Sequence, residues 1–376
     1  MSQRRCPTCQ RIYEGDARFC PRDGTPLVDA AATPAATPAA GPPAAAPPAA
    51  AAAPPASPST TQVRMAVKPK PSSVDPAKTL REQVLDGRYK VVKKLGEGGM
   101  SYVYEAQDVS TGEHVAVKIM TPKLAQDKTA ADRLRREAGL AMRLDHPNVC
   151  PIKRLGETPE GLIYLVMPLL RGELLSDKEV REGALPVDAG VPIMKQVCAG
   201  LQYAHGLQIV HRDLKPENIF VEPQPGGALR AVVMDFGLAK ERRAEPGMAK
   251  LTATGIILGT PEFMSPEQIR GKPLDGRSDI YALGLVAFEM FTTKLPFEGK
   301  TAQDMMIARL RGQPIPLRRA RPDLEFSAAF EKALMKAIET EPAERYQSAL
   351  EFSKALEDAV AGGAPGGMMG KLKKMF

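Results

Sequence analysis

Residues 211–218 read His211-Arg212-Asp213-Leu214-Lys215-Pro216-Glu217-Asn218 and place three chemically different side chains within six positions. A carboxylate such as Asp213 can orient a hydroxyl group and accept its proton during phosphoryl transfer. Lys215 can reach a transferring phosphoryl group, and the amide oxygen of Asn218 can coordinate magnesium. The stretch therefore predicts phosphoryl transfer to a hydroxyl, with Asp213 as the base.

A second candidate metal ligand lies further along the chain. Asp235-Phe236-Gly237 follows the apolar run 231–234, which has the composition of a buried strand. Hard cations such as Mg²⁺ take oxygen ligands, and Mn²⁺ could replace Mg²⁺. We therefore expect Asp235 and Asn218 to hold the metal ion.

A glycine-rich stretch, Gly96-Glu97-Gly98-Gly99-Met100-Ser101-Tyr102-Val103, lies between two strand patterns. Glycines allow the backbone to approach a polyphosphate closely, and exposed N–H groups can bind its oxygens. The alternative is a glycine-rich hairpin turn without a ligand. The following strand, Val115-Ala116-Val117-Lys118, carries one lysine that could hold the α- and β-phosphates.

Lys118 needs a carboxylate to orient it, and the expected helix 128–144 offers Glu137. Glu137 lies three residues after Leu134 and four before Ala141, so it shares the inward face of this helix. The prediction is therefore a Lys118–Glu137 ion pair. The alternative is a surface pair between Glu137 and a neighbouring arginine.

The pattern of the globular part changes once along the chain. Short β-branched runs at 89–95, 101–108, 114–120 and 162–167 surround the helix 128–144. After Gly172 the pattern is mostly helical, as at 191–205, 278–292 and 327–339. The expected fold is α+β and bilobal, with a small β-rich lobe followed by a larger helical lobe.

In order and spacing, Gly96, Gly98, Lys118, Glu137, Asp213, Asn218 and Asp235 resemble the signature set of eukaryotic-type (Hanks-type) protein kinases, over about residues 89–359. The stretch is similar to the bacterial serine/threonine branch. The resemblance implies transfer of the γ-phosphoryl group of ATP to protein hydroxyls, with magnesium. Lys215, together with Gly259-Thr260, implies serine and threonine acceptors, with Thr260 in the substrate site.

The resemblance also implies the residues around ATP. They are Gly96, Glu97, Gly98, Gly99, Met100, Ser101, Val103, Ala116, Lys118, Met167, Pro168 and Leu170. Two of them depart from the family pattern: Ser101 replaces the third glycine, and Pro168 follows the gatekeeper Met167 where an acid is usual. Proline removes one N–H, but the carbonyl of Pro168 and the N–H of Leu170 remain. We therefore expect ATP binding to be intact and an inactive, ATP-binding scaffold to be the weaker alternative.

Further matches concern the closing of the activation segment and its regulation. Ser265-Pro266-Glu267 resembles the family's closing motif, which implies that Glu267 pairs with Arg345. Asp279, within 278–284, matches the family's helix-start aspartate, which implies that it braces the catalytic loop; the alternative is a plain N-cap. Thr252 and Thr254 lie where related bacterial kinases autophosphorylate. We expect a phosphate there to be held by Arg212, and the alternative is exposed threonines without a role.

The first 28 residues contain Cys6, Cys9, Cys20 and Asp23 in a spacing that resembles a small zinc ribbon. Asp23 stands where a fourth cysteine would be expected, so the predicted site is Cys₃Asp. The alternatives are a degenerate ribbon or a thiol-bearing tail. A protein partner is the expected ligand of this unit, which could also make the chain a zinc-dependent adaptor that carries a kinase domain.

The remaining sequence sets the domain boundaries. An Ala/Pro-rich linker is expected at 29–86, the kinase domain at 87–359 and a flexible tail at 360–376. The basic, apolar end of the tail could dock weakly on a partner or an anionic membrane. The net charge of +7 is modest for 376 residues, so nucleic acid binding is not expected. The sequence predicts no transmembrane segment or signal peptide, and the cysteine usage favours the cytoplasm.

Overall fold

The computed structural model describes residues 3–5, 12–14, 28–29, 80, 82–98, 101–122, 124, 127–159, 161–236, 261–299 and 301–363. Near the N-terminus, three short strands form an antiparallel sheet in the order β2-β1-β3, with bounds β1 Gln3–Arg5, β2 Ile12–Glu14 and β3 Val28–Asp29.

A six-stranded antiparallel sheet forms the first lobe, in the order β4-β5-β6-β7-β9-β8. The strands predicted at 101–108 and 114–120 are confirmed, with both ends at the expected residues. Val84–Leu85 forms a strand inside the segment that we expected to be linker, and the neighbouring Leu80 is buried. The bounds are β4 Val84–Leu85, β5 Tyr89–Gly98, β6 Ser101–Asp108, β7 His114–Met120, β8 Arg154–Glu157 and β9 Ile163–Pro168.

Helix α2 (Lys128–Ala141) covers one face of this sheet. It begins at Asp127, whose side chain accepts a hydrogen bond from the Ala130 N–H, and this is a stabilising N-cap. Ala131, Leu134 and Ala138 repeat at helical spacing and pack on Ile163 and Leu165 of β9. The opposite face of the sheet forms a separate core with the buried tyrosines and valines of β5 to β9.

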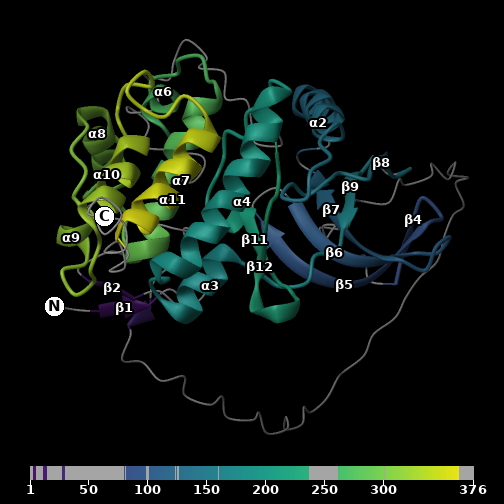
Figure 1. The fold of residues 1–376 in the computed structure, drawn as a ribbon. Helices are drawn as coiled ribbons and strands as arrows, with labels where there is room; N and C mark the ends of the chain where they lie inside the picture. The colour runs from purple at the N-terminus through teal and green to yellow at the C-terminus, as the bar shows by residue number, and fades with distance from the viewer. Residues whose placement is uncertain are drawn as a thin grey trace, which may run out of the picture.

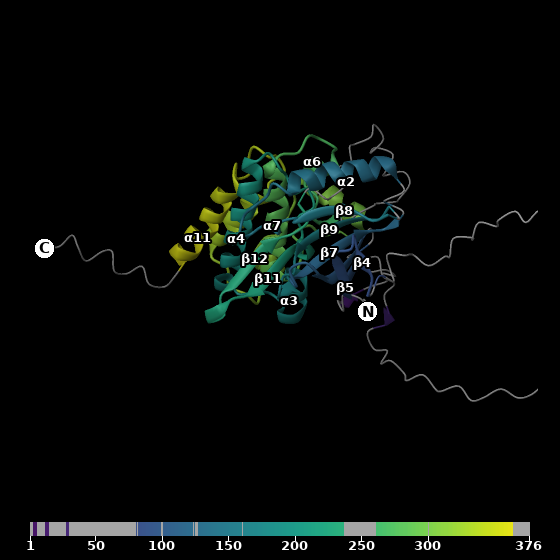
Figure 2. The same cartoon turned by 90° about the vertical axis from the view of Figure 1, so that its right-hand side faces the viewer.

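The second lobe is helical and packs around α7 (Gly276–Thr292). Every residue from Ser278 to Thr292 is buried, as expected for a helix that is apolar around its whole circumference. Helices α4, α10 and α11 pack against it, as Figure 1 shows, and Figure 2 shows α4 and α11 beside it from another side. The other helices are α3 Leu175–Glu182, α4 Val187–Gly206, α6 Pro266–Ile269, α8 Ala302–Arg311, α9 Leu317–Ala320, α10 Ala328–Ala337 and α11 Ala349–Gly363.

A small sheet lies where the two lobes meet (Figure 1). Its order is β10-β11-β12, with bounds β10 Glu173–Leu174, β11 Ile219–Pro223 and β12 Leu229–Val233. Short 3₁₀ turns occur at Pro216–Asn218, Pro225–Gly227 and Pro261–Phe263. The fold therefore confirms the expected β-rich lobe followed by a helical lobe, and the hairpin β11–β12 joins the catalytic stretch to Asp235.

Candidate active site

The catalytic stretch 211–218 is held in place by Asp279 of α7. This carboxylate is buried and accepts hydrogen bonds from the backbone N–H groups of His211 (2.8 Å) and Arg212 (2.9 Å). It also lies 2.7 Å from Nε2 of His205. Burial raises the pKa of Asp279, but these donors more than offset burial and keep the pKa below its usual value. The expected bracing role of Asp279 is confirmed.

His211 links the catalytic stretch to the residues around Asp235. Its Nε2 lies 2.7 Å from the carbonyl oxygen of Met234, which can only accept, so Nε2 carries a proton. Its Nδ1 then accepts from the N–H of Asp213 at 3.3 Å. The ring packs edge-on against Phe236, with centroids 4.8 Å apart. The two ligand-bearing segments are thus fixed relative to each other.

The three side chains of the catalytic stretch converge on one point. Nζ of Lys215 lies 3.4 Å from Oδ2 of Asp213. The amide nitrogen of Asn218 donates to the backbone carbonyl of Asp213 at 2.7 Å and lies 3.4 Å from its carboxylate. The Asp213 side chain is 42 % exposed, so an incoming hydroxyl group can reach it.

Among the described residues, Lys118 of β7 forms an ion pair with Asp235. Nζ of Lys118 lies 2.6 Å from Oδ2 of Asp235, whereas we expected the pair with Glu137 of α2, which is half-buried. Burial raises the pKa of Asp235, but the nearby Lys118, His211 and Lys215 outweigh burial and hold the pKa below its usual value. The mutual attraction of two groups shielded from water explains why this pair forms.

The glycine-rich stretch forms the hairpin between β5 and β6. Gly96 pairs with Val103, Glu97 with Tyr102 and Gly98 with Ser101. Gly99 and Met100 at its tip lie outside the described residues. A Cβ atom at Gly96 would meet nothing within 4 Å, and one at Gly98 would meet Ser101 only at 3.8 Å. Packing within the described chain therefore does not require glycine at these two positions.

The expected adenine-binding segment follows at the end of β9. Ala116 pairs with Met167, and Val115 pairs with Pro168, so Pro168 is still part of the sheet. Leu170 is half-buried just beyond it. A small hollow next to Met167 is also lined by Ala141, Cys150, Ile152, Asp235 and Phe236. Burial raises the pKa of the Cys150 thiol to about 12.

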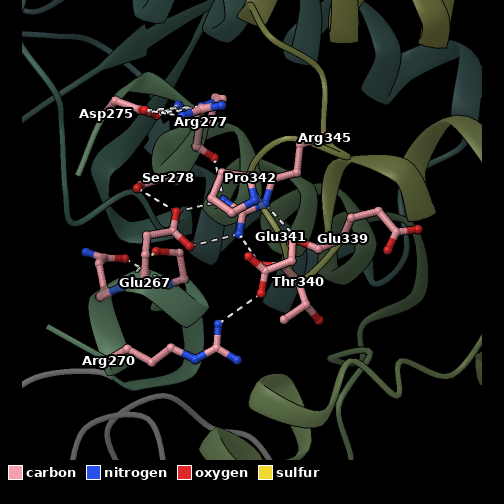
Figure 3. A network of polar contacts seen from close by, with 12 residues as sticks. Glu267, Arg270, Asp275, Arg277, Ser278, Glu339, Thr340, Glu341, Pro342 and Arg345 are labelled. Carbon is pink, nitrogen blue, oxygen red and sulfur yellow. Dashed lines mark hydrogen bonds and ion pairs between the residues drawn. The ribbon is translucent and has the colours of Figure 1, made fainter. Parts of the chain in front are cut away.

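Away from the reacting groups, Glu267 of α6 is paired with Arg345, as expected (Figure 3). The hydroxyl of Ser278 donates to the same carboxylate at 2.6 Å. Ser265, which replaces the family's alanine, caps α6 in a reciprocal arrangement with Gln268. The Gln268 side chain then donates to the backbone carbonyl of Arg212 at 2.7 Å. Helix α6 is thereby tied directly to the catalytic stretch.

Sequence reasoning missed Ser278 and Gln268. The capping-box pattern Ser-x-x-Gln at 265–268 could have revealed one of them.

Several predicted site residues lie outside the described part of the chain. They are Thr252, Thr254, Thr260, Cys6, Cys9, Cys20 and Asp23. Arg212 is described, and its backbone has φ +68°, a conformation that residues other than glycine rarely adopt. Within the described ranges, no group of three or more His, Cys, Asp or Glu side chains could hold a metal ion. No described helix is long and apolar enough to cross a bilayer.

Comparison with known families decides the classification. Residues 89–357 match the family described as protein kinase domain. This chain belongs to the protein kinase domain family.

Two curated relatives of this kinase domain are bacterial. The serine/threonine-protein kinase pkn3 of Myxococcus xanthus is 38 % identical over 270 residues, which are 72 % of this chain and 49 % of pkn3. PknB of Mycobacterium leprae is 36 % identical over 285 residues, which are 75 % of this chain and 44 % of PknB. This chain therefore spans about half the length of these relatives, or less.

Solved structures agree with the fold of this kinase domain. The kinase domain of PknI from Mycobacterium tuberculosis superimposes with a TM-score of 0.58 at 29 % identity, covering 74 % of this chain and 99 % of that one. Rad53 in complex with AMP-PNP gives a TM-score of 0.59 at 26 % identity, covering 71 % and 64 %. Family membership implies use of ATP and a divalent metal ion.

Proposed function

We propose that this chain is an ATP-dependent serine/threonine protein kinase. The observation that carries the proposal is the convergence of Asp213, Lys215 and Asn218, braced by Asp279, opposite the Lys118–Asp235 pair. The names of the bacterial relatives, which are serine/threonine-protein kinases, support the same activity.

In the proposed reaction, Asp213 orients the acceptor hydroxyl and takes its proton. The hydroxyl oxygen bonds to the γ-phosphorus of ATP, the bond from that phosphorus to the bridging oxygen breaks, and ADP leaves. Lys215 lies close enough to Asp213 to neutralise the transferring group. Such a site acts mainly by positioning and charge neutralisation.

The ATP site is proposed along the glycine-rich hairpin and the end of β9. The open space beside Gly96 suits the close approach of phosphates, because no neighbouring atom of the described chain fills it. Ala116 and Met167 would line the base, and Lys118 would hold the phosphates. The carbonyl of Pro168 and the N–H of Leu170 would bind the adenine.

Asn218 and Asp235 are the proposed ligands of Mg²⁺ or Mn²⁺. Both offer oxygen, and the amide nitrogen of Asn218 is already engaged by the Asp213 carbonyl, which leaves its oxygen for a cation. Mg²⁺ usually takes one or two protein ligands together with water and phosphate, so a pair of ligands suffices. The metal would neutralise charge on the phosphates.

Regulation through the activation segment is part of the proposal. Phosphate on Thr252 or Thr254, placed by autophosphorylation in a signalling role, would be held by Arg212, and Thr260 would contribute to the substrate site. The tie from Gln268 to the Arg212 carbonyl supports communication between these parts. Phosphopeptide mapping of active enzyme tests this: modification of neither Thr252 nor Thr254 would refute it.

The segments outside the kinase domain are proposed to bind zinc and partners. A zinc site made by Cys6, Cys9, Cys20 and Asp23 is supported by the Cys-x-x-Cys spacing and by the short antiparallel strands β1 to β3. Residues 1–28 would bind a protein partner and the tail a partner or membrane, with the whole chain in the cytoplasm. Metal analysis of the purified chain, compared with a Cys6→Ser/Cys9→Ser variant, tests the zinc site.

Asp213→Asn tests the assigned base. We expect this variant to bind AMP-PNP with the affinity of the wild type and to lose nearly all transfer of labelled phosphate to a generic protein substrate. Full transfer by Asp213→Asn would remove Asp213 from its proposed role.

A further inference from the structure

The hairpin β11–β12 occupies a special place between the two proposed metal ligands. It begins directly after Asn218, and its second strand ends two residues before Asp235. Any shift of this hairpin therefore moves both ligands relative to Lys118, which belongs to the other lobe. What holds the hairpin against the first lobe and against the segment that joins the lobes then determines the geometry of the site.

The segment that joins the lobes follows β9 and reaches the hairpin at Glu222. The Glu222 carboxylate accepts a hydrogen bond from the backbone N–H of Arg171 at 2.8 Å. Next to it, Gly172 lies so close to β11 that a Cβ atom would be 2.1 Å from the carbonyl oxygen of Val221. The chain therefore passes from β9 into the second lobe in direct contact with β11.

A segment of the first lobe, which connects α2 to β8, reaches the hairpin at Arg230. The Arg230 guanidinium donates twice to the carbonyl oxygen of Pro147, from Nε at 3.0 Å and from Nη2 at 2.7 Å. Beyond Pro147, the same segment continues alongside β12 through a parallel bridge between Val149 and Val233. The Cys150 N–H donates to the Val233 carbonyl at 2.8 Å.

Glu222 and Arg230 face each other across the hairpin and form an ion pair of 3.0 Å. The Glu222 side chain is 11 % exposed and the Arg230 side chain 39 %. The second carboxylate oxygen of Glu222 and the other guanidinium nitrogens of Arg230 make the contacts described above. This single pair thus connects the segment after β9 and the α2–β8 segment of the first lobe to the hairpin that carries the metal ligands.

We propose that Glu222 and Arg230 are positioning residues that set Asn218 and Asp235 relative to Lys118, and so control how strongly a divalent cation promotes nucleotide binding. The proposal rests on the assignment of Asn218 and Asp235 as metal ligands. Residues that orient metal ligands from outside typically change metal affinity by about 10- to 100-fold when they are replaced.

The test measures AMP-PNP affinity of the full chain by calorimetry, with and without Mg²⁺. Binding without Mg²⁺ depends on the glycine-rich hairpin, the end of β9 and Lys118, so Arg230→Met should change it little. In the presence of Mg²⁺, we expect Arg230→Met to weaken binding about tenfold. Arg230→Lys keeps the charge but cannot make the double contact to Pro147, and an intermediate loss is expected.

Two further variants separate positioning from general stability. Glu222→Gln keeps the shape and one acceptor for Arg171 but removes the charge, so it should lower the Mg²⁺ enhancement in the same direction as Arg230→Met. Arg318→Met breaks a pair of similar burial on the second lobe, in which the Glu331 side chain is 12 % exposed. This control should leave the Mg²⁺ enhancement at its wild-type value even if its melting temperature falls.

A wild-type Mg²⁺ enhancement in both Arg230→Met and Glu222→Gln would overturn the proposal and leave the pair a purely structural contact. An equal loss in Arg318→Met would overturn it as well. Nucleotide binding is measured here without phosphoryl transfer. If the wild-type chain proved unable to phosphorylate protein, the proposed function would fail while the role of Glu222 and Arg230 could still be judged.

Discussion

Lys118 and Asp235 lie in different lobes, 117 residues apart, and are joined by an ion pair of 2.6 Å. Their side chains are 16 % and 27 % exposed, so water solvates the two charges only in part. The ion pair offsets the solvation that each charge has lost. The pair brings a proposed phosphate ligand and a proposed metal ligand to the same point of the site.

Lys118→Met should therefore destabilise the protein in a pH-dependent way. Burial would remain while the attraction is lost, so the pKa of Asp235 would rise above its usual value. A carboxylate with a raised pKa costs stability above that pKa and less as it becomes protonated. We expect a loss of about 2 kcal/mol at pH 8, shrinking towards pH 5. Urea unfolding measures it, and the Lys118→Met/Asp235→Asn double variant should show no such pH dependence.

Arg345→Met should be among the most damaging substitutions away from the reacting groups. Arg345 makes five hydrogen bonds, two of them to Glu267 at 2.7 and 2.8 Å. Its loss leaves a buried carboxylate unpaired, which typically costs about 3–5 kcal/mol. Chemical unfolding measures the loss, and the Arg345→Met/Glu267→Gln double variant should recover part of it. A loss below that of an exposed pair, such as Arg321–Asp323, would contradict the expectation.

Asp279→Asn should reduce catalysis more than nucleotide binding. The amide can accept with only one atom, and its NH₂ group would face a backbone N–H of the catalytic stretch. Misplacing the catalytic stretch by about 1 Å can cost about 100-fold in rate. The control is Asp275→Ala, which removes the N-cap of the same helix and should lower the free energy of unfolding by about 1 kcal/mol. Equal kcat values for both variants would contradict the bracing role.

Gly96 and Gly172 should respond differently to alanine. At Gly96 the added methyl group meets open space, so stability should be unchanged while ATP affinity falls. At Gly172 it would collide with the Val221 carbonyl, so the melting temperature should fall. Thermal unfolding and AMP-PNP titration of both variants check this. A Gly96→Ala variant with unaltered affinity would argue for a plain hairpin turn.

Local patterns predicted much of this fold. The strands 101–108 and 114–120, which the structure confirms, could be predicted because their apolar runs end at clear turn signals. The helix expected at 278–292 begins two residues earlier, because Asp275, and not Asp279, provides its cap. β4 was missed because a strand of two residues has no periodicity, and its stability comes from pairing with β5.

Pairings between distant segments were harder to predict. The sequence pattern suggested Glu137 as the partner of Lys118 and gave no sign of Asp235, which the tertiary packing of the two lobes brings to Lys118. The Glu222–Arg230 pair was also missed. An opposite-charge pair across a hairpin could have suggested it, but its contacts to Arg171 and Pro147 depend on the whole fold.

The most direct test of the proposed kinase activity is phosphate transfer from γ-labelled ATP by the purified chain with Mg²⁺, comparing the wild type with Asp235→Ala. We expect label on serine and threonine in the wild type. We also expect at least about a 100-fold loss in Asp235→Ala, with the fold retained by thermal unfolding. Equal labelling of both proteins, or no labelling of a folded wild type that binds AMP-PNP, would contradict it.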